Sequence, residues 1–293
     1  MRSNEMWIYR FVVIILSFAF SISPGKAQTP QPTPTPSASP TLERQFLKNI
    51  LLDQKAIWTA PFHLHSADAH WAAPLAFGTA ALIVSDQQTG DEIAEANGQL
   101  KASRIVSYAG SAYGVGAVTA GFYLFGRAKH DDRARETGIL GAEALVDSAI
   151  LVTAVKSITQ RTRPDGGRAR SDFFDGGSSF PSGHSIEAWS LATVVANEYH
   201  DRRAVQIAAY GIATAVSISR FTGEKHYLSD ILVGSAMGYG IGRYVYHAHH
   251  RPSSSGGGEE EEELGDHDRR WPAVTPLFDS HAHNYGLGLA WSF

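Results

Sequence analysis

The chain has 293 residues, of which 43% are hydrophobic and 18% charged, and its formal net charge is −4. So small a negative charge argues against a nucleic-acid partner, because such partners are held mainly by clustered Lys and Arg. The chain contains no cysteine, which excludes disulfides, thiolate metal sites and thiol catalysis. Its length allows one large domain with additional tails.

The N-terminus has the features of an export signal. Basic residues precede an apolar run of twelve residues, Phe11–Ile22, and small residues follow up to Ala27. This order predicts a signal peptide over residues 1–27, cleaved before Gln28. The alternative is an uncleaved membrane anchor, although the run is shorter than the roughly 20 residues of a full span. Either way we expect an exported protein of the cell envelope, in the inner membrane with a periplasm-facing site or in the periplasm.

A Pro/Thr-rich linker is expected over residues 28–41, followed by a helical domain over residues 42–250. Residues 41–58 carry a helical apolar stripe. Further Ala/Gly-rich apolar segments of helical length follow, at residues 71–85, 105–126, 137–156, 184–199, 204–219 and 228–246. None of them shows strand alternation, so the domain is predicted to be all-α.

Several of these helices are candidates for a membrane. Ile105–Gly126 is uncharged over 22 residues and is long enough to cross a bilayer. Other helices carry acidic residues that must face a bundle interior or water, namely Glu143, Asp147, Glu187 and Asp230. We favour membrane integration over the alternative of a soluble periplasmic bundle.

The C-terminal part is polar at first. Residues 251–268 form a Gly/Glu-rich linker, and His247, His249 and His250 precede it. These histidines suit a transition metal chemically, but the sequence fixes no ligand geometry, so no metal site is predicted.

Residues 269–293 end in an alternation of large and small side chains from Tyr285 to Phe293. This pattern predicts a short C-terminal β-hairpin resting on the bundle, or else a tail. Its C-terminal aromatic residue also resembles the end of an outer-membrane barrel, but one or two strands cannot close a barrel.

Three short stretches carry the chemistry. The first places Lys156 at a predicted helix end and Arg163 in the loop behind it, where Pro164 disfavours helix. Two cations placed in this way can converge on an anion. Alone, the stretch also suits a basic helix C-terminus that complements the helix dipole, for which Arg161 would suffice.

The second stretch, Phe180–His184, leads through Pro181 into a helix expected to begin near Ser182. Free N–H groups at such a start bind anions, and Gly183 lets the backbone approach an oxyanion. His184 stands beside them as a possible acid for a leaving alkoxide. Alone, the stretch also fits a capping serine with an incidental histidine.

In the third stretch Arg220 is followed by His226 and Asp230, which are four residues apart and so share a helix face. A carboxylate that binds one imidazole nitrogen leaves the other as a directed nucleophile. The guanidinium of Arg220 suits phosphate oxygens. A purely structural His–Asp pair is the alternative.

Together the stretches Lys156-x6-Arg163-Pro164, Pro181-Ser182-Gly183-His184 and Ser219-Arg220-x5-His226-x3-Asp230 resemble the three-part motif of the type 2 phosphatidic acid phosphatase family. Bacterial non-specific acid phosphatases and vanadium haloperoxidases belong to the same superfamily. All three parts match in order at their defining positions, and the resemblance covers roughly residues 71–247.

The resemblance implies a six-helix core with the site at one end. It implies that His226 is the nucleophile, that Asp230 orients it and that His184 is the general acid. Phosphate binding would fall to Lys156, Arg163, Ser182, Gly183 and Arg220. Neither a metal nor another cofactor is implied.

The expected enzyme is therefore a phosphoric ester hydrolase that acts on a lipid phosphate, such as phosphatidate or an isoprenyl diphosphate, through a phosphohistidine. A soluble periplasmic acid phosphatase acting on small phosphate esters is the close alternative. A vanadate-dependent haloperoxidase and a non-enzymatic surface protein are less favoured. No oligomeric state is predicted.

Overall fold

The computed structural model describes residues 41–94, 103, 106–108, 110–164, 171–250, 273–279 and 284–290. The predicted signal peptide over residues 1–27, nearly all of the linker over 28–41 and the linker over 251–268 lie outside these residues.

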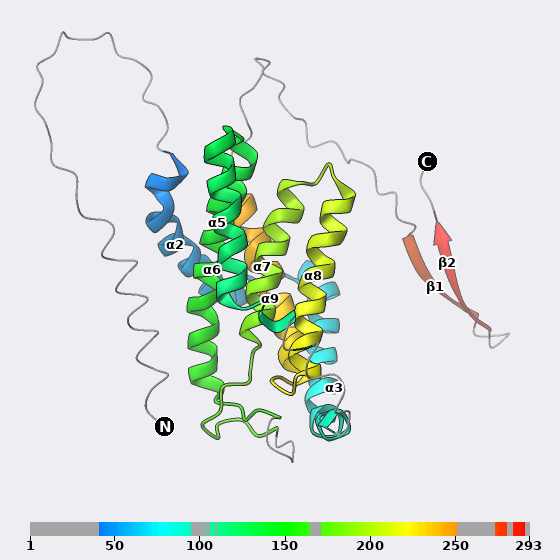
Figure 1. Cartoon of the computed structure of the whole chain (residues 1–293). Coiled ribbons are helices and arrows are strands. Elements are labelled where there is room, and N and C mark those ends of the chain that lie inside the picture. Colours follow the sequence, from blue (N-terminus) through cyan, green and yellow to red (C-terminus); the bar gives the residue numbers. More distant parts are fainter. Residues whose placement is uncertain are drawn as a thin grey trace, which may run out of the picture.

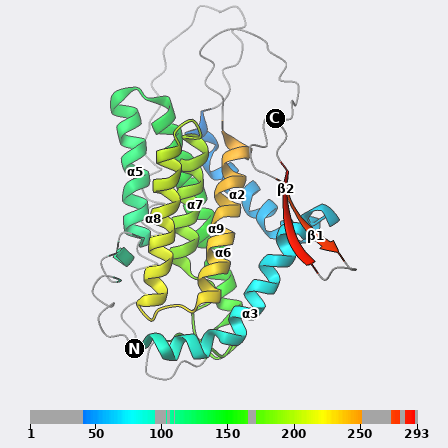
Figure 2. The same cartoon turned by 90° about the vertical axis from the view of Figure 1, so that its right-hand side faces the viewer.

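Helices form the regular secondary structure of the described residues up to position 250, so the all-α prediction is confirmed for this region. The elements in chain order are α2 (Leu42–Thr59), two short 3-10 turns (Ala60–His63 and Ser66–Asp68), α3 (Ala69–Ala94), α5 (Ala112–Lys129), α6 (Asp132–Thr159), α7 (Gly183–Glu198), α8 (Arg203–Thr222) and α9 (Leu228–His249). Helices α5 to α9 run along one common direction, whereas α2 and α3 cross it obliquely (Figures 1 and 2).

One predicted helix is wrong in its extent. Ile105–Gly126 was expected to be a single apolar segment, but the chain turns at Gly110, and α5 begins only at Ala112. A Cβ at Gly110 would lie 2.1 Å from Cγ1 of Val216 in α8, so the backbone packs there too closely for a side chain. Ser111 then caps α5 by accepting a hydrogen bond from the Gly114 N–H. The turn divides the uncharged run, which therefore does not form one membrane span.

Helices α7 and α9 pack with their backbones in close contact. Cβ atoms added at Gly234, Gly238 and Gly242 of α9 would lie 2.8, 2.3 and 2.3 Å from carbonyl oxygens of α7 or its cap. These glycines recur every four residues, so they form one face of α9. The same packing brings the start of α9 to the start of α7, where the Ser182 N–H donates to the Asp230 carbonyl over 3.0 Å.

The main hydrophobic core lies between α6, α7 and α9. Its buried members are Leu140, Ala144, Leu151, Val152, Ile186, Val194, Ile241, Val245 and Tyr246. Helix α7 is central, since residues on most of its circumference are buried. The ends of the three helices are thereby fixed relative to one another.

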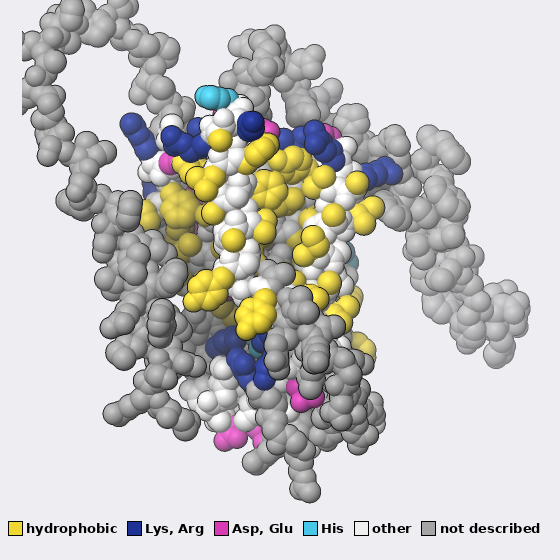
Figure 3. Space-filling view, viewed as in Figure 1, with side chains coloured by type: hydrophobic (Ala, Val, Ile, Leu, Met, Phe, Trp, Pro, Cys, Tyr) yellow, Lys and Arg dark blue, Asp and Glu magenta, His cyan; other side chains and the backbone are white. Residues whose placement is uncertain are grey.

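Among the described residues, α6 and α8 are long and apolar enough to cross a membrane. Figure 3 shows hydrophobic side chains over α5 and α8. They lie between one group of Lys and Arg side chains at one end of these helices and a second group of Lys and Arg side chains nearer the other end. Exposed members on these helices include Val118, Leu124, Phe125, Ile207, Ile212 and Ile218. Of the acidic residues predicted to face either the bundle interior or water, Glu143, Asp147 and Asp230 are buried in the interior and Glu187 is partly buried.

The two C-terminal strands, β1 (Ala273–Asp279) and β2 (Asn284–Ala290), pair antiparallel. Their register places Ala273 opposite Ala290 and Asp279 opposite Asn284.

Candidate active site

The three stretches singled out in the sequence meet at one end of the bundle. The end of α6, the loop before α7, the end of α8 and the start of α9 all lie there (Figure 1). Gln160 ends α6 in the left-handed conformation, and Ser182 caps α7 by accepting from the Ser185 N–H. These two residues bound the loop that joins the first two stretches. The predicted helix start near Ser182 is confirmed.

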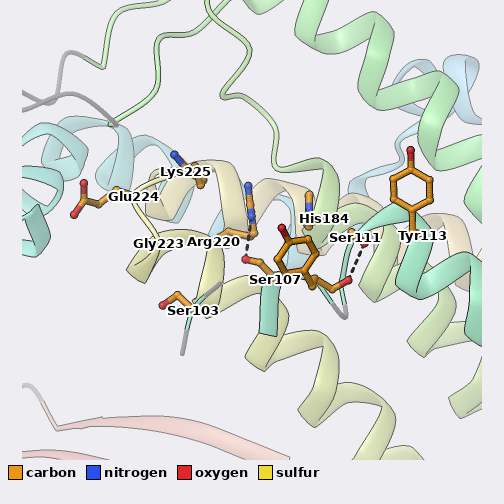
Figure 4. Close-up of a pocket in the computed structure, with 10 residues that line it drawn as sticks. Ser103, Ser107, Ser111, Tyr113, His184, Arg220, Gly223, Glu224 and Lys225 are labelled. Carbon is orange, nitrogen blue, oxygen red and sulfur yellow. Dashed lines mark hydrogen bonds between the residues drawn. The ribbon is translucent and has the colours of Figure 1, made fainter. Parts of the chain in front are cut away.

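A cavity of about 590 Å³ opens at this end, and His184 and Arg220 are part of its lining. In Figure 4 these two side chains lie next to each other, with Tyr113 of α5 to one side and Glu224 and Lys225 to the other. The lining also includes serines and a tyrosine that the sequence did not single out, namely Ser103, Ser107, Tyr108 and Ser111.

His226 and Asp230 form a buried pair below the surface. Nδ1 of His226 lies 3.5 Å from Oδ2 of Asp230, and the two side chains are 2% and 0% exposed. Asp230 also accepts hydrogen bonds from the Tyr227 N–H over 2.9 Å and from the Ser179 hydroxyl over 2.5 Å. With Nδ1 turned toward the carboxylate, Nε2 is the imidazole nitrogen left for a substrate.

Sequence reasoning missed the residue that holds Asp230. Arg161 is 0% exposed and donates from Nη1 to Asp230 Oδ1 over 2.7 Å and from Nη2 to Asp86 Oδ2 over 2.9 Å. It also donates to the Ser229 hydroxyl, and its guanidinium lies over the Phe173 and Tyr227 rings. Arg161 is thus the centre of a buried ionic network. The interpretation of Arg161 as a cation that merely complements the dipole at the end of a helix is therefore wrong. Asp86 lies 75 positions away in sequence, so no local pattern could reveal the contact.

The three cations predicted to bind phosphate all lie within electrostatic reach of His184, and two of them also lie within reach of His226. Lys156 and Arg163 both act on His184 and His226, and Arg220 acts on His184. Arg220 is oriented by donating from Nη1 to the Ser107 hydroxyl over 2.9 Å, and Arg163 donates to the Ser178 hydroxyl over 3.3 Å. Such a concentration of positive charge suits an anion.

Residues 182 and 183 differ in how they face this charge. A Cβ at Gly183 would lie 3.9 Å from Nζ of Lys156, so the glycine backbone is close to the ammonium group. The Ser182 side chain is instead fully buried, and its oxygen accepts from the Ser185 N–H and hydroxyl. The structure therefore brings Gly183 to the cations and uses Ser182 as a cap.

Burial and positive neighbours keep both histidines neutral. Burial is the first cause in each case, lowering the pKa of His184 to about 3 and that of His226 to about 4. The pKa of Asp230 lies below its usual value: burial pushes it up, but His226, Arg161 and the Ser179 hydroxyl more than offset this. The pair is therefore a neutral imidazole beside a carboxylate.

The three stretches also lie within a segment that is similar to a known protein family. A family model described as the PAP2 superfamily matches residues 137–253, a range that includes every residue of the three stretches. Over this range the chain is similar to proteins of that superfamily.

A curated relative is the lipid A 1-phosphatase of Porphyromonas gingivalis, 35% identical over 127 residues. The match covers 43% of this chain and 26% of the relative, so the chain spans about a quarter of the relative's length.

Two solved structures also resemble this chain. LpxE of Aquifex aeolicus is 21% identical with a TM-score of 0.40, over 50% of this chain and 83% of that one. The PAP2-type phosphatidylglycerolphosphate phosphatase of Bacillus subtilis is 22% identical with a TM-score of 0.40, over 70% of this chain and 94% of that one.

Proposed function

We propose that this protein is a metal-independent phosphatase that removes phosphate from a lipid phosphate monoester or diphosphate through a phosphohistidine intermediate. The observation that carries the proposal is the convergence of a carboxylate-oriented histidine, a second histidine and three cations at one end of the bundle. A phosphoryl group needs a nucleophile, an acid for its leaving group and charge neutralisation for its oxygens, and this set supplies all three.

In the first step Nε2 of His226 attacks phosphorus, the phosphorus–oxygen bond to the alcohol breaks, and the alcohol oxygen takes a proton from His184. Lys156, Arg163, Arg220 and the Gly183 N–H would hold the remaining phosphate oxygens. The low pKa of His184 results from its burial and from its cationic neighbours. A bound phosphate brings negative charge among these cations, so it raises the pKa of His184 toward the range in which the ring can act as an acid.

In the second step water attacks the phosphohistidine. His184, now neutral, accepts a proton from this water, and the bond between phosphorus and Nε2 breaks. Inorganic phosphate leaves and His226 is restored as a neutral imidazole. Asp230 stabilises the positive charge that His226 carries as the phosphohistidine forms, and Arg161 keeps Asp230 in place.

A lipid substrate is supported by the surroundings of the cavity. Tyr108 and Tyr113 are lining residues that are themselves 72% exposed, and the exposed apolar side chains of α5 and α8 continue from this end along the bundle. A lipid head group could reach the cations here while its chains remain against the apolar surface. The lipid A 1-phosphatase relative is consistent with such a substrate. The export signal predicted at the N-terminus favours a periplasm-facing site.

The test is phosphate release by the purified full chain in detergent. Phosphatidate, an isoprenyl diphosphate and a lipid A phosphate should be hydrolysed faster than glycerol phosphate, with no loss of activity in EDTA. Replacing His226 by alanine should abolish turnover, because no other nucleophile replaces it, whereas the exposed His200→Ala control should remain active.

Equal rates on lipid and soluble esters would favour the soluble acid phosphatase instead. Near-normal turnover by His226→Ala would refute the mechanism. A peroxidase activity that requires vanadate and peroxide, without phosphatase activity, would place the chain with the haloperoxidases.

A further inference from the structure

Three buried carboxylates gather in the bundle away from the phosphatase cavity. Asp53 of α2 and Glu143 and Asp147 of α6 are each 0% exposed, and His249 near the end of α9 lies against them. Glu143 is 13 positions before Lys156 on the same helix, which corresponds to about 20 Å along its axis. The cluster is therefore separate from the phosphate site, and the proposed mechanism does not use it.

The hydrogen bonds within the cluster leave carboxylate oxygens without a donor. Nε2 of His249 lies 2.8 and 3.0 Å from the two carboxylate oxygens of Asp53. The Asn49 amide donates to Oε1 of Glu143 over 3.0 Å, and the Gln54 amide donates to Oδ1 of Asp147 over 2.8 Å. Among the described residues, Oε2 of Glu143 and Oδ2 of Asp147 are buried and have no hydrogen-bond partner.

The charges do not balance either. Within the cluster, three carboxylates face a single imidazole. Buried carboxylates are stable only when they are paired with a cation, bound to a metal or protonated. A divalent ion would supply two positive charges and at the same time a partner for the free oxygen of Glu143.

We propose that Asp53, Glu143 and His249 bind a divalent transition-metal ion, Zn²⁺ or Mn²⁺. One ligand atom from each residue lies within 4.8 Å of the other two. Such ions bind oxygen and nitrogen ligands at about 2.0–2.2 Å, so two ligand atoms on opposite sides of the ion are about 4 Å apart. Small rotations of the three side chains would therefore bring their ligand atoms to binding distance of one ion. Two carboxylates with one imidazole are donors that both ions accept.

The surroundings suit this role. Asn49 already holds one oxygen of Glu143, as outer groups do around metal-binding carboxylates. The ligands come from α2, α6 and α9, so the ion would fasten α2, the first described helix, to the bundle. The sequence pointed to three neighbouring histidines, but His250 faces a different pair, Glu136 and Glu198, and His247 is exposed.

The experiment is Zn²⁺ and Mn²⁺ binding to the untagged full chain in detergent, stripped with EDTA and measured by equilibrium dialysis with elemental analysis. Wild type and the matched control His247→Gln should bind one equivalent with the same affinity. His249→Gln and Glu143→Gln should each bind at least about tenfold more weakly, since even outer-shell changes cost that much. The run of five glutamates at 259–263 is present in every variant and sets a common background.

A second measurement guards against variants that misfold. The metal should raise the Tm of wild type and of His247→Gln but not that of His249→Gln, while phosphatase activity of the stripped protein should persist in all three. If wild type binds no more metal than His249→Gln, the proposal is refuted and the cluster is held together by shared protons. If His250→Gln abolishes binding and His249→Gln does not, the ion sits between Glu136 and Glu198 and the assignment is wrong.

Discussion

Replacing Arg161 by methionine should destabilise the protein far more than the same replacement of an exposed arginine. Methionine keeps much of the aliphatic volume beside Phe173 and Tyr227 but removes the charge. Asp86 and Asp230, both fully buried, then lose a cation at 2.9 and 2.7 Å. Removing one partner from a buried ion pair costs about 3–5 kcal/mol, mostly because the remaining charge is left without compensation.

For a domain of this size each kcal/mol lowers Tm by about 2–4 °C, so the expected fall is about 6–20 °C. The assay is thermal denaturation of the purified protein in detergent. The matched control is Arg135→Met: Arg135 is 38% exposed and lies 3.6 and 3.7 Å from Glu43 and Asp132. Exposed pairs of this kind contribute about 0–1 kcal/mol.

The activity of Arg161→Met gives a second readout. Turnover should fall, because Asp230 loses the group that positions it against His226. Inhibition by vanadate should change less, because Lys156, Arg163 and Arg220, the three cations proposed to bind phosphate, remain. If Arg161→Met and Arg135→Met show the same small change in Tm, Arg161 is not the centre of a structural ionic network and the reasoning fails.

Three further predictions follow from the site and the packing. His184→Gln should lower the turnover of a lipid phosphate by roughly 10²–10⁴-fold. The turnover of nitrophenyl phosphate should fall much less, because a good leaving group needs no acid. Equal losses on both substrates would argue against an acid role for His184. As the pH drops from about 6.5 to 4, the Tm of His184→Gln should rise relative to that of wild type, because the unfolded wild-type chain binds a proton at His184 that the folded chain, with the pKa of His184 lowered to about 3, does not. The comparison between the two proteins is the readout, because burial raises the pKa of Glu187 and Glu198 to about 7 and these groups stabilise the folded chain on acidification in both. The same difference in Tm at pH 6.5 and at pH 4 would contradict this prediction. Gly238→Ala should lower the free energy of unfolding by about 1–3 kcal/mol, because its Cβ would lie 2.3 Å from the Ile186 carbonyl oxygen. Gly240→Ala has open space around its Cβ and should be neutral or stabilising. Denaturation of the two variants side by side measures this difference, and equal stabilities would contradict the close packing of α7 on α9.

Local patterns in the sequence determined much of this protein. Apolar periodicity predicted the helices, and Pro181 with Ser182 predicted the start of α7, because caps and helix propensity act over a few residues. The spacing of His226 and Asp230 likewise placed them on one face, since four residues make about one helical turn. The three-part motif was by itself sufficient to suggest a phosphatase.

Contacts between distant segments were decided only by the tertiary structure. Nothing near Arg161 in sequence indicates that it is buried between Asp86 and Asp230, because the first of these lies 75 positions away. His249 and Asp53 are 196 positions apart, so the sequence alone does not show that carboxylates lie beside this histidine. The break at Gly110 depends on Val216 of another helix. Hydrophobic periodicity indicates which face of a helix is buried, but it does not indicate which side chains of other helices contact that face. Those contacts set the charges and distances on which the candidate active site and the proposed metal site depend.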